Sequence, residues 1–549
     1  MAKVIRTNKK KKTESVCETF YLFWGYLLDL LICIYMLLIL VVLPFYNEEG
    51  FTHIGTDKAM FFRNAALKCG MAIVPVLVLF LVFKLVLFFL ETPKKSVWSA
   101  IREYCKKEMS VTDWCALAYG VAVILSYLFS AYREEALWGT TGWYMGVRTQ
   151  LILVFSYFLI SRAWTARSWM LLLVLPVSAI VFVLGLLNRF GCFPIDMQVE
   201  NELFISTIGN VNWYCGYLVS VFFGVLFLLW KKDWKKLWQK MLLMAYVVIG
   251  FATLVTHGST SGVVTMAVMI LVFFWLSVPD GKRMEAFWLE LCLLSLTSTI
   301  IFLLRHFKIL TIVFEDEGVM LFTGTILPII MTAVSLAGYL GVRYSNQKLC
   351  YPEKIFGILA KLACGGIVVA VVAYVLVLFI NTQNNGALLA STMLAESNMF
   401  TFSPTWGSNR GATWLAGLYC FGEQDFLHKL VGVGPDCMAA FIYGDAGEGL
   451  QAMVKETFAS ARLTNAHNEW LTMLVQVGAL GAVSYVGMMI SAIKRYISSR
   501  NFNIVAGICG CCLLAYTINN MFSFQQSMSA ATIFIILGVG ENYIRNRDV

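Results

Sequence analysis

Long stretches of apolar residues, separated by short polar segments, follow one another along almost the whole chain. A helix rises about 1.5 Å per residue, so roughly 20 apolar residues are enough to cross the hydrocarbon core of a membrane. These stretches do not alternate between apolar and polar positions, as the strands of a membrane-spanning barrel would. The pattern therefore predicts an all-α fold, a polytopic bundle of transmembrane helices.

The apolar stretches predict about fourteen spans, with twelve as the alternative count. They lie near residues 20–43, 65–90, 111–130, 148–161, 168–187, 211–230, 241–257, 261–278, 285–304, 319–341, 357–380, 467–490, 502–518 and 528–541. The chain then divides into a basic N-terminal tail (1–19), N-terminal spans (20–130), a central transmembrane region (131–380), a large external loop (381–466), C-terminal spans (467–541) and a C-terminal tail (542–549).

Lysine and arginine gather in every second loop, and this fixes the expected orientation of the helices. If the N-terminus with Lys9 and Lys12 is cytoplasmic, the even-numbered loops are cytoplasmic too and carry most of the basic residues. The odd-numbered loops are poor in basic residues and contain acidic pairs such as Glu134 with Glu135. The alternation predicts an even number of spans, with both termini cytoplasmic.

The composition supports a membrane protein and excludes a soluble domain. Hydrophobic residues make up 59% of the chain and charged residues 14%, whereas soluble domains carry about a quarter charged residues. The net charge of +9 is explained by basic loops that orient the helices, so no nucleic-acid partner is expected. The first apolar stretch is too long for a signal-peptide core and no small-residue cleavage site follows it, so we expect it to be retained as a span.

The large external loop, residues 381–466, has room for a small folded subdomain. It contains two possible short amphipathic helices, near 413–421 and 435–443, and too many aromatic and aliphatic residues for a disordered segment. We therefore expect a helical external subdomain. Cys420 and Cys437 both fall in this loop, and the sequence leaves open whether they form a disulfide.

A histidine stands at the expected external mouth of the twelfth span. Residues 465–471 read NAHNEWL, which puts His467 in the first turn of the helix, at the water boundary. A neutral imidazole there is able to remove a proton from a hydroxyl group near neutral pH. The alternative is a histidine that only caps or anchors an interfacial helix end.

Two arginines on the external side are candidates for binding a diphosphate. Arg410 is one of few basic residues in the large loop, and Arg148 lies at the external end of the fourth span. A planar guanidinium matches a pair of phosphate oxygens. The alternatives are a solvated loop arginine for Arg410 and a side chain that reaches to the membrane surface for Arg148. Residues 432–436 (GVGPD) lack the strand and helix of a nucleotide fold and predict a tight turn.

Taken in order and spacing, four short motifs resemble those of the O-antigen ligase and O-antigen polymerase family of bacterial membrane enzymes. They are GNVNWY at 209–214, Arg410 followed by Trp414, the GVGPD turn, and HNEWL at 467–471 running on to Gly478 and Gly481. The resemblance covers roughly residues 130–490 and leaves out the first three and the last two spans.

The sequence departs from the family pattern at one turn. The family often has Ser-Arg-Gly after the seventh span, whereas residues 256–262 here read THGSTSG, without an arginine. Two explanations remain open: His257 takes part of that role, or Arg148 and Arg410 supply the positive charge.

The resemblance implies a metal-independent, inverting glycosyltransferase of the bacterial cytoplasmic (inner) membrane that serves polysaccharide biosynthesis for the cell envelope. Its partners would be a polyprenyl-diphosphate-linked oligosaccharide donor (on undecaprenyl diphosphate), a glycan acceptor and membrane lipids, and no cofactor is implied. The site residues that it implies are the base His467, the diphosphate-binding Arg410, Arg148 and His257, and the supporting Asn468, Glu469, Asn210 and Asn212.

The sequence leaves several functions open. A polymerase of capsular or exopolysaccharide is favoured over a ligase, but the sugar, the linkage and the acceptor are not determined. The alternative class is a lipid-linked oligosaccharide flippase or other transporter, which fourteen spans suit equally well. Such a carrier would not require the large loop that ends in the histidine motif. A third possibility, a peptidoglycan-type polymerase, would depend on an acidic residue rather than on His467.

The charge alternation makes a topological prediction. Alkaline phosphatase fused within residues 381–466 should be active, because this loop is expected outside, whereas a fusion at the C-terminus should be inactive. Green fluorescent protein at the same two positions should give the opposite result. An active phosphatase at the C-terminus would mean either that the number of spans is odd or that the orientation is inverted.

Overall fold

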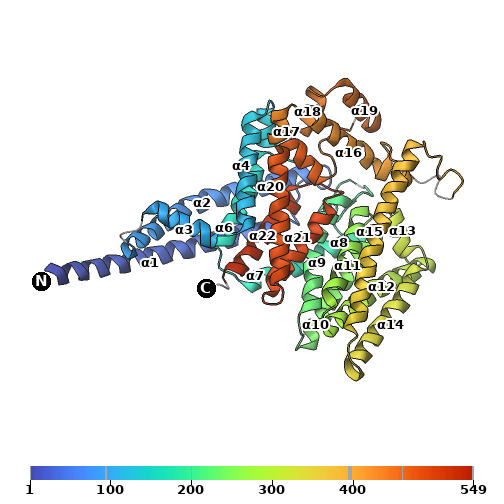
Figure 1. Ribbon diagram of the computed structural model, residues 1–549, viewed down its shortest axis with the longest axis horizontal. Coiled ribbons are helices and arrows are strands. Elements are labelled where there is room, and N and C mark those ends of the chain that lie inside the picture. Colours follow the sequence, from blue (N-terminus) through green and yellow to red (C-terminus); the bar gives the residue numbers. More distant parts are fainter. Residues whose placement is uncertain (1, 93–95, 200, 393–397, 460, 547–549) are drawn as a thin grey trace.

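The computed structural model describes residues 2–92, 96–199, 201–392, 398–459 and 461–546, with side chains described from residue 16 on and not at residues 398 and 408. It is an all-α polytopic bundle, and its helices are labelled in Figure 1. Within the described residues, twelve helical segments are long and apolar enough to cross a membrane. They are α1 (Ala2–Leu37) with the π-helical turn η1 (Leu38–Val42), α2 (Ile54–Glu91), α4 (Val111–Phe129), α7 with α8 (Ser168–Leu172 and Val174–Arg189), α9 (Val211–Lys231), α10 (Leu237–Thr256), α11 (Thr260–Ser277), α12 (Gly281–His306), α14 (Leu327–Lys348), α15 (Glu353–Gln383), α20 (Glu469–Ser499) and α22 (Ser527–Arg545).

The two remaining predicted spans are helices, but short ones. They are α6 (Val147–Ala163) and α21 (Ile504–Asn519), with 17 and 16 residues. The number twelve thus counts only the long apolar helices, whereas the number fourteen also counts α6 and α21. Several boundaries differ from expectation: α2 begins at Ile54 rather than near 65, and α20 ends at Ser499 rather than near 490. The span expected at 319–341 is divided between α13 (Glu317–Thr323) and α14, and α1 begins at Ala2, so the N-terminal basic tail is helical.

The remaining elements are short. They are α3 (Val97–Glu108), α5 (Arg133–Trp138), η2 (Asn398–Phe400), α16 (Trp406–Glu423), α17 (Phe426–Val431), α18 (Met438–Gly444), α19 (Glu448–Phe458), and an antiparallel pair of two-residue strands, β1 (Phe204–Ile205) and β2 (Gly209–Asn210). The strands form a small hairpin directly before α9 and pair Ile205 with Gly209.

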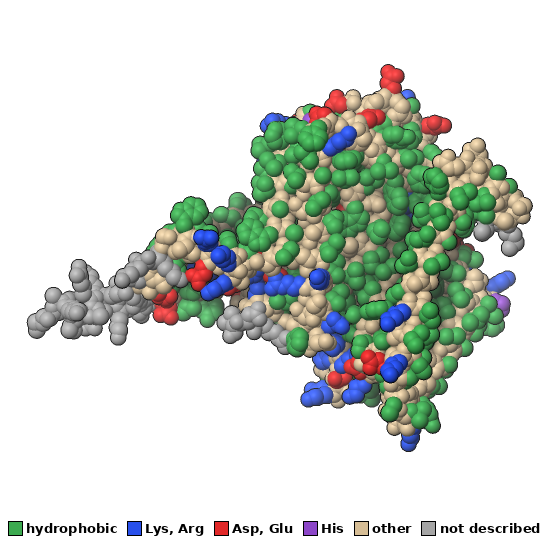
Figure 2. Space-filling view, viewed as in Figure 1, with side chains coloured by type: hydrophobic (Ala, Val, Ile, Leu, Met, Phe, Trp, Pro, Cys, Tyr) green, Lys and Arg blue, Asp and Glu red, His purple; other side chains and the backbone are tan. Residues whose placement is uncertain are grey.

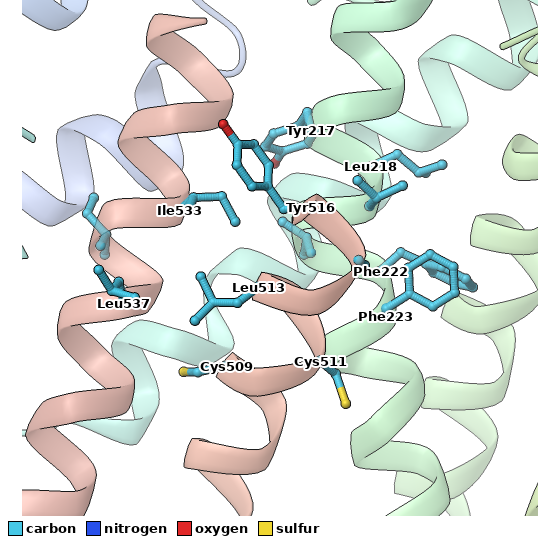
Figure 3. Close-up of a cluster of buried hydrophobic side chains, with 14 of the residues drawn as sticks. Tyr217, Leu218, Phe222, Phe223, Cys509, Cys511, Leu513, Tyr516, Ile533 and Leu537 are labelled. Atoms are coloured by element: carbon cyan, nitrogen blue, oxygen red, sulfur yellow. The ribbon is translucent and has the colours of Figure 1, made fainter. Parts of the chain in front are cut away.

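The centre of the bundle is built by α9, α21 and α22. The apolar stretches of α9 and α22 are the most deeply buried of the candidate spans. Figure 3 shows α21 between them: Leu513 and Tyr516 lie between Ile533 of α22 and Phe222 of α9. A helix that is apolar on all sides is stable only where neighbours surround it. The short α21 is therefore a core helix.

The outer helices are much less covered. The α15 helix has no buried residue in its apolar stretch, and α2 has few. In Figure 1, α1 and α2 pack along each other and extend away from the rest of the bundle toward the N-terminus. Apolar surface of this extent is stable in contact with lipid chains and unfavourable in water.

The large loop folds as expected into a helical subdomain, α16 to α19, which lies at the top in Figure 1. It has a small apolar core of its own that includes Cys420, Met438 and Leu450. Cys420 and Cys437 are both buried in this core and both are free thiols. The end of the bundle that carries this subdomain is called the loop end below.

The opposite end is rich in basic residues. In Figure 2 most of the visible Lys and Arg side chains lie toward the lower and left edges, and several acidic side chains lie at the top. At this basic end an ion-pair network ties four helix ends together. Asp113 pairs with Arg162 (3.0 Å) and with Arg545, while Glu541 pairs with Arg495 (2.9 Å) and with Arg545 (3.1 Å). The cations there have acidic partners and stabilise the bundle.

One helix is broken by a close backbone crossing. Gly478 in α20 has φ +68° and ψ −176°, which no α-helix contains. A Cβ at Gly478 would overlap the Leu430 carbonyl, and one at Gly432 (φ +81°) would overlap the Gln476 carbonyl. The break frees two carbonyls of α20. The amides of Val433 (3.2 Å) and Gly434 (3.1 Å) donate to the carbonyls of residues 475 and 476, and further donors come from residues 126 and 424.

This crossing makes a stability prediction. Gly478→Ala and Gly432→Ala should each lower the free energy of unfolding by about 3 kcal/mol, because a side chain meets both a left-handed backbone and a backbone neighbour. Gly366→Ala on α15 is the matched control, since no atom lies within 4 Å of its Cβ position. Thermal unfolding in detergent measures the difference. If all three variants were equally stable, the close backbone contact between Gly432 and Gly478 would be contradicted.

Candidate functional site

The loop between α21 and α22 brings the two main candidates together. Arg410 on α16 donates hydrogen bonds to the Phe522 carbonyl, from Nε at 3.4 Å and from Nη2 at 3.3 Å. The His467 ring, just before α20, meets the Phe524 ring edge-on, with 5.1 Å between centroids. The guanidinium and the imidazole thus lie beside one short segment of chain, close enough for electrostatic interaction.

The imidazole of His467 is left free by its surroundings. Its backbone is in the left-handed region, at φ +46°, and its N–H donates to Asn465 Oδ1 at 3.0 Å. The next residue, Asn468, caps α20, because its Oδ1 accepts from the Leu471 amide at 3.1 Å. The residue that caps α20 is therefore Asn468 and not His467. In the described part of the chain, neither ring nitrogen of His467 has a hydrogen-bond partner.

Burial, together with the nearby Arg410 charge, lowers the pKa of the His467 imidazole to about 4. Burial also lowers the pKa of Arg410, but a guanidinium remains charged at any physiological pH. Its hydrogen bonds go to carbonyls, including that of Gly407 at 3.0 Å, and no carboxylate among the described residues pairs with it. The site therefore offers a neutral proton acceptor beside a cation that lacks a counter-ion.

Glu469 fastens the start of α20 to α21. Its carboxylate, 1% exposed, accepts hydrogen bonds from the hydroxyls of Tyr516 (3.1 Å) and Tyr485 and from the Asn520 amide. Its backbone N–H donates to the Asn520 carbonyl at 2.9 Å. These hydrogen bonds use both carboxylate oxygens of Glu469, and neither oxygen is directed at the His467 ring. Glu469 therefore supports the site by holding the start of α20 in position.

The motif at 209–214 is held to the 256–262 turn by hydroxyl bridges. Asn210 caps α9, with its Oδ1 accepting from the Asn212 amide at 2.9 Å. Asn212 Oδ1 accepts from the Ser259 hydroxyl at 2.8 Å, and Ser259 and Ser261 share a hydrogen bond of 2.8 Å. Asn212 thus holds the 256–262 turn, where the resemblance led us to expect an arginine, and Asn210 caps α9 beside it.

This polar chain continues to the histidine motif. Cys215 Sγ lies 3.7 Å from the Ser261 hydroxyl and donates to Asn519 Oδ1 at 3.3 Å. Asn519 in turn donates to Asn520 Oδ1 at 3.2 Å, and Asn520 holds Glu469. Three motifs that are far apart in sequence are therefore connected through the end of α21.

His257 is buried beneath the site. Its Nδ1 bonds to the Leu254 carbonyl at 2.7 Å, and its Nε2 has no partner among the described residues and faces Gly262, where a Cβ would lie 2.5 Å away. Burial lowers the pKa of His257 to about 4, against the effect of the Leu254 bond. Arg189 donates to the His257 carbonyl at 2.5 Å. Residues 256–262 contain no arginine themselves, but Arg189 from the end of α8 lies against this turn.

Arg148 is not with the other candidates. Its guanidinium carbon lies 3.7 Å above the Trp138 ring, and the same ring is approached by Arg63 at 5.2 Å. None of the contacts recorded for the described residues joins Arg148 to Arg410 or His467. The structure therefore separates the predicted cations into two positions.

The GVGPD turn is a tight turn, as predicted, and it holds a buried carboxyl. Asp436, at φ +62°, accepts from the backbone amides of Thr140 (2.8 Å) and Met145 (3.0 Å). Burial raises the pKa of Asp436 to about 7. Asp436, Glu469 and Gln476 line an enclosed cavity of about 20 Å³, room for about one water molecule. The turn positions the α5–α6 connection against α20.

The α21–α22 loop is the part of the site that the sequence did not predict. Residues 519–526 (NNMFSFQQ) contribute Phe522 to Arg410 and Phe524 to His467. They lie outside the family resemblance and have no charged side chain. The sequence offered one signal for this loop: it is polar and aromatic, and it lies on the side expected to be external. Within the described part of the chain, no three His, Cys, Asp or Glu side chains gather as metal ligands would.

Comparisons with known proteins give no further identification. No protein-family model matches the chain, and no curated protein matches it.

The buried histidine gives a pH prediction. Between pH 6.5 and about 4 the unfolded chain binds a proton at residue 257 that the folded protein does not, so stability falls as the pH falls through this window. The loss for His257 is up to about 3 kcal/mol. In His257→Gln the slope of stability against pH should be correspondingly shallower, as measured by thermal unfolding at several pH values. His306→Gln, at an exposed histidine at the end of α12, is the matched control for the loss of a histidine. Parallel curves for wild type and His257→Gln would contradict the burial of an uncharged imidazole.

Proposed function

We propose that the protein transfers glycan from a polyprenyl-diphosphate-linked donor to an acceptor hydroxyl at the loop end, which the proposed topology puts outside the cytoplasmic membrane. The observation that carries this proposal is the pairing of a free, neutral imidazole with a guanidinium that has no acidic partner. General-base catalysis at a hydroxyl and stabilisation of a diphosphate are the two tasks of such a transfer.

The chemistry assigns one role to each side chain. The acceptor oxygen attacks the anomeric carbon, its proton passes to a ring nitrogen of His467, and the bond from the anomeric carbon to the diphosphate oxygen breaks. The diphosphate leaves with the electron pair and its added negative charge, which Arg410 stabilises. A single displacement of this kind inverts the anomeric centre and needs no covalent intermediate.

Binding of the donor improves the base. The positive charge of Arg410 helps to keep the pKa of His467 at about 4 in the free protein, which is low for a base that works near neutral pH. A diphosphate beside Arg410 compensates that charge, and a negative charge near the imidazole raises its pKa. The base is thus strengthened when the donor is present, which limits unproductive reaction with water.

The loop subdomain favours an enzyme over a carrier. Arg410 comes from α16 of this subdomain, and its partner Phe522 comes from the opposite side of the site. A carrier has no need for a folded cover that places a cation beside a free imidazole. Between the two enzymes, a polymerase of capsular or exopolysaccharide is the preferred form of the proposal, and an O-antigen-type ligase is the second.

Two substitutions test the proposal. His467→Ala should slow consumption of the lipid-linked donor by about 100- to 10,000-fold, and Arg410→Ala by about 100- to 1,000-fold. Arg410→Lys should recover part of the loss, because it keeps the charge but not the planar fork. Polymer length on gels and donor consumption in membranes are the measurements.

Matched controls come from other residues of the loop end. His428 on α17 bonds to Asp425 and to the Phe129 carbonyl, and Arg305 pairs with Glu315. Their alanine variants should leave the polymer unchanged. Full-length polymer from both His467→Ala and Arg410→Ala, at normal membrane yield, would rule the mechanism out.

A further inference from the structure

Two arginines on neighbouring helices meet at one tryptophan without a counter-ion. Arg148 of α6 lies 3.7 Å above the Trp138 ring and Arg63 of α2 lies 5.2 Å from its centre. Arg63 also lies 5.9 Å from the ring of Tyr144. No hydrogen bond or ion pair recorded for the described residues involves either guanidinium. Two like charges held together in this way favour an anion between them, and two guanidinium forks match the oxygens of a diphosphate.

An apolar groove starts directly below this arginine pair. It has a volume of about 560 Å³ and runs between the same two helices, α2 and α6. Leu67 follows Arg63 by four residues and Ile152 follows Arg148 by four, so each arginine stands one turn above a groove residue on the same helix face. The pair therefore caps the loop end of the groove.

The groove continues toward the basic end. A second cavity of about 860 Å³ between α2, α3 and α6 shares Phe155 and Leu159 with the first. Along α2 the combined trough reaches from Leu67 to Phe88, which is about 30 Å of helix and close to the thickness of the hydrocarbon core. A lipid chain fits this trough along the whole depth of the membrane.

A polar cleft lies on the other side of the arginine pair. It has a volume of about 700 Å³, and Trp138 and Tyr144, the two rings that Arg63 approaches, are part of its wall. Glu134 and Arg462 also line it. Aromatic rings flanked by charged side chains suit the mixed apolar and polar faces of a sugar. Trough, cation pair and cleft therefore follow one another in the order of lipid chain, diphosphate and glycan.

We infer that this trough binds a second polyprenyl-diphosphate-linked glycan, with its diphosphate between Arg63 and Arg148, and presents it as the acceptor. The inference rests on the proposed function, because it adds an acceptor position to the donor position at Arg410. Two lipid-linked substrates are what a polymerase requires. On this inference, Arg148 and Arg410 lie apart because each binds the diphosphate of a different substrate.

Native mass spectrometry of the purified protein with undecaprenyl diphosphate tests the inference. The wild-type protein should bind two equivalents. The double variant Arg63→Ala/Arg148→Ala should bind one, and Arg410→Ala should also bind one, at the other position. Gly70→Trp should bind one as well, because Gly70 lines the groove and no atom lies within 4 Å of its Cβ position, so the new ring takes up space in the trough.

Matched controls separate the trough from general effects of substitution. Lys68→Ala removes an exposed cation of α2 outside the groove wall, and Gly366→Trp adds the same ring at an equally open position on α15. Both should bind two equivalents. The equivalent that remains in Gly70→Trp and in the double variant also shows that those proteins are folded.

The outcomes distinguish this inference from the proposed function. One equivalent in the wild type that Arg410→Ala abolishes would overturn the acceptor trough and leave the proposed function standing. No binding in any variant would overturn both. Equal displacement of the trough equivalent by phosphatidylglycerol, or by undecaprenol without a diphosphate, would show a general lipid groove and overturn the inference.

Discussion

The structure of the loop end depends on the backbone crossing between Gly432 and Gly478. Because neither position has a side chain, the turn after α17 reaches the axis of α20 and opens the helix there. The carbonyls set free are satisfied by amides of the same turn, so the break costs no unpaired polar group inside the membrane region. It also ties the first part of α20, residues 469–477, to the turn after α17.

The fixed segment supports everything that the candidate site contains. Glu469 binds the end of α21 through Asn520 and Tyr516, and this holds the α21–α22 loop in place. That loop carries the partners of both Arg410 and His467. Asp436, on the same turn as Gly432, holds the α5–α6 connection that positions Arg148. A change at the crossing should therefore affect both cation positions at once.

Apolar runs predicted the helices because a membrane span needs about 20 apolar residues whatever its neighbours are. The same apolar runs also predicted α6 and α21, which the structure shows as helices of 17 and 16 residues. Motif order placed Arg410 near His467 correctly. It could not place Arg148, since the Trp138 ring that it packs on ends the short helix α5, and Arg63 comes from a span outside the resemblance. The Phe522–Phe524 segment was missed for a related reason: an uncharged loop carries no signal until tertiary structure puts it beside a cation.

Three arginines of the basic end and three of the loop end differ in their surroundings rather than in their chemistry. At the basic end, Arg162, Arg495 and Arg545 all have acidic partners, and their charges are compensated within the protein. At the loop end, Arg63, Arg148 and Arg410 pack on aromatic rings and have no carboxylate among their recorded contacts. A guanidinium on an aromatic face keeps its hydrogen-bonding edge available. Charge that stabilises a fold is paired, and charge kept for a ligand is held in place without being neutralised. Arg305 and Arg462 at the same end pair with Glu315 and Glu135. The proposal therefore assigns anions to Arg63, Arg148 and Arg410, and their division into two positions is the reason that it includes two diphosphates.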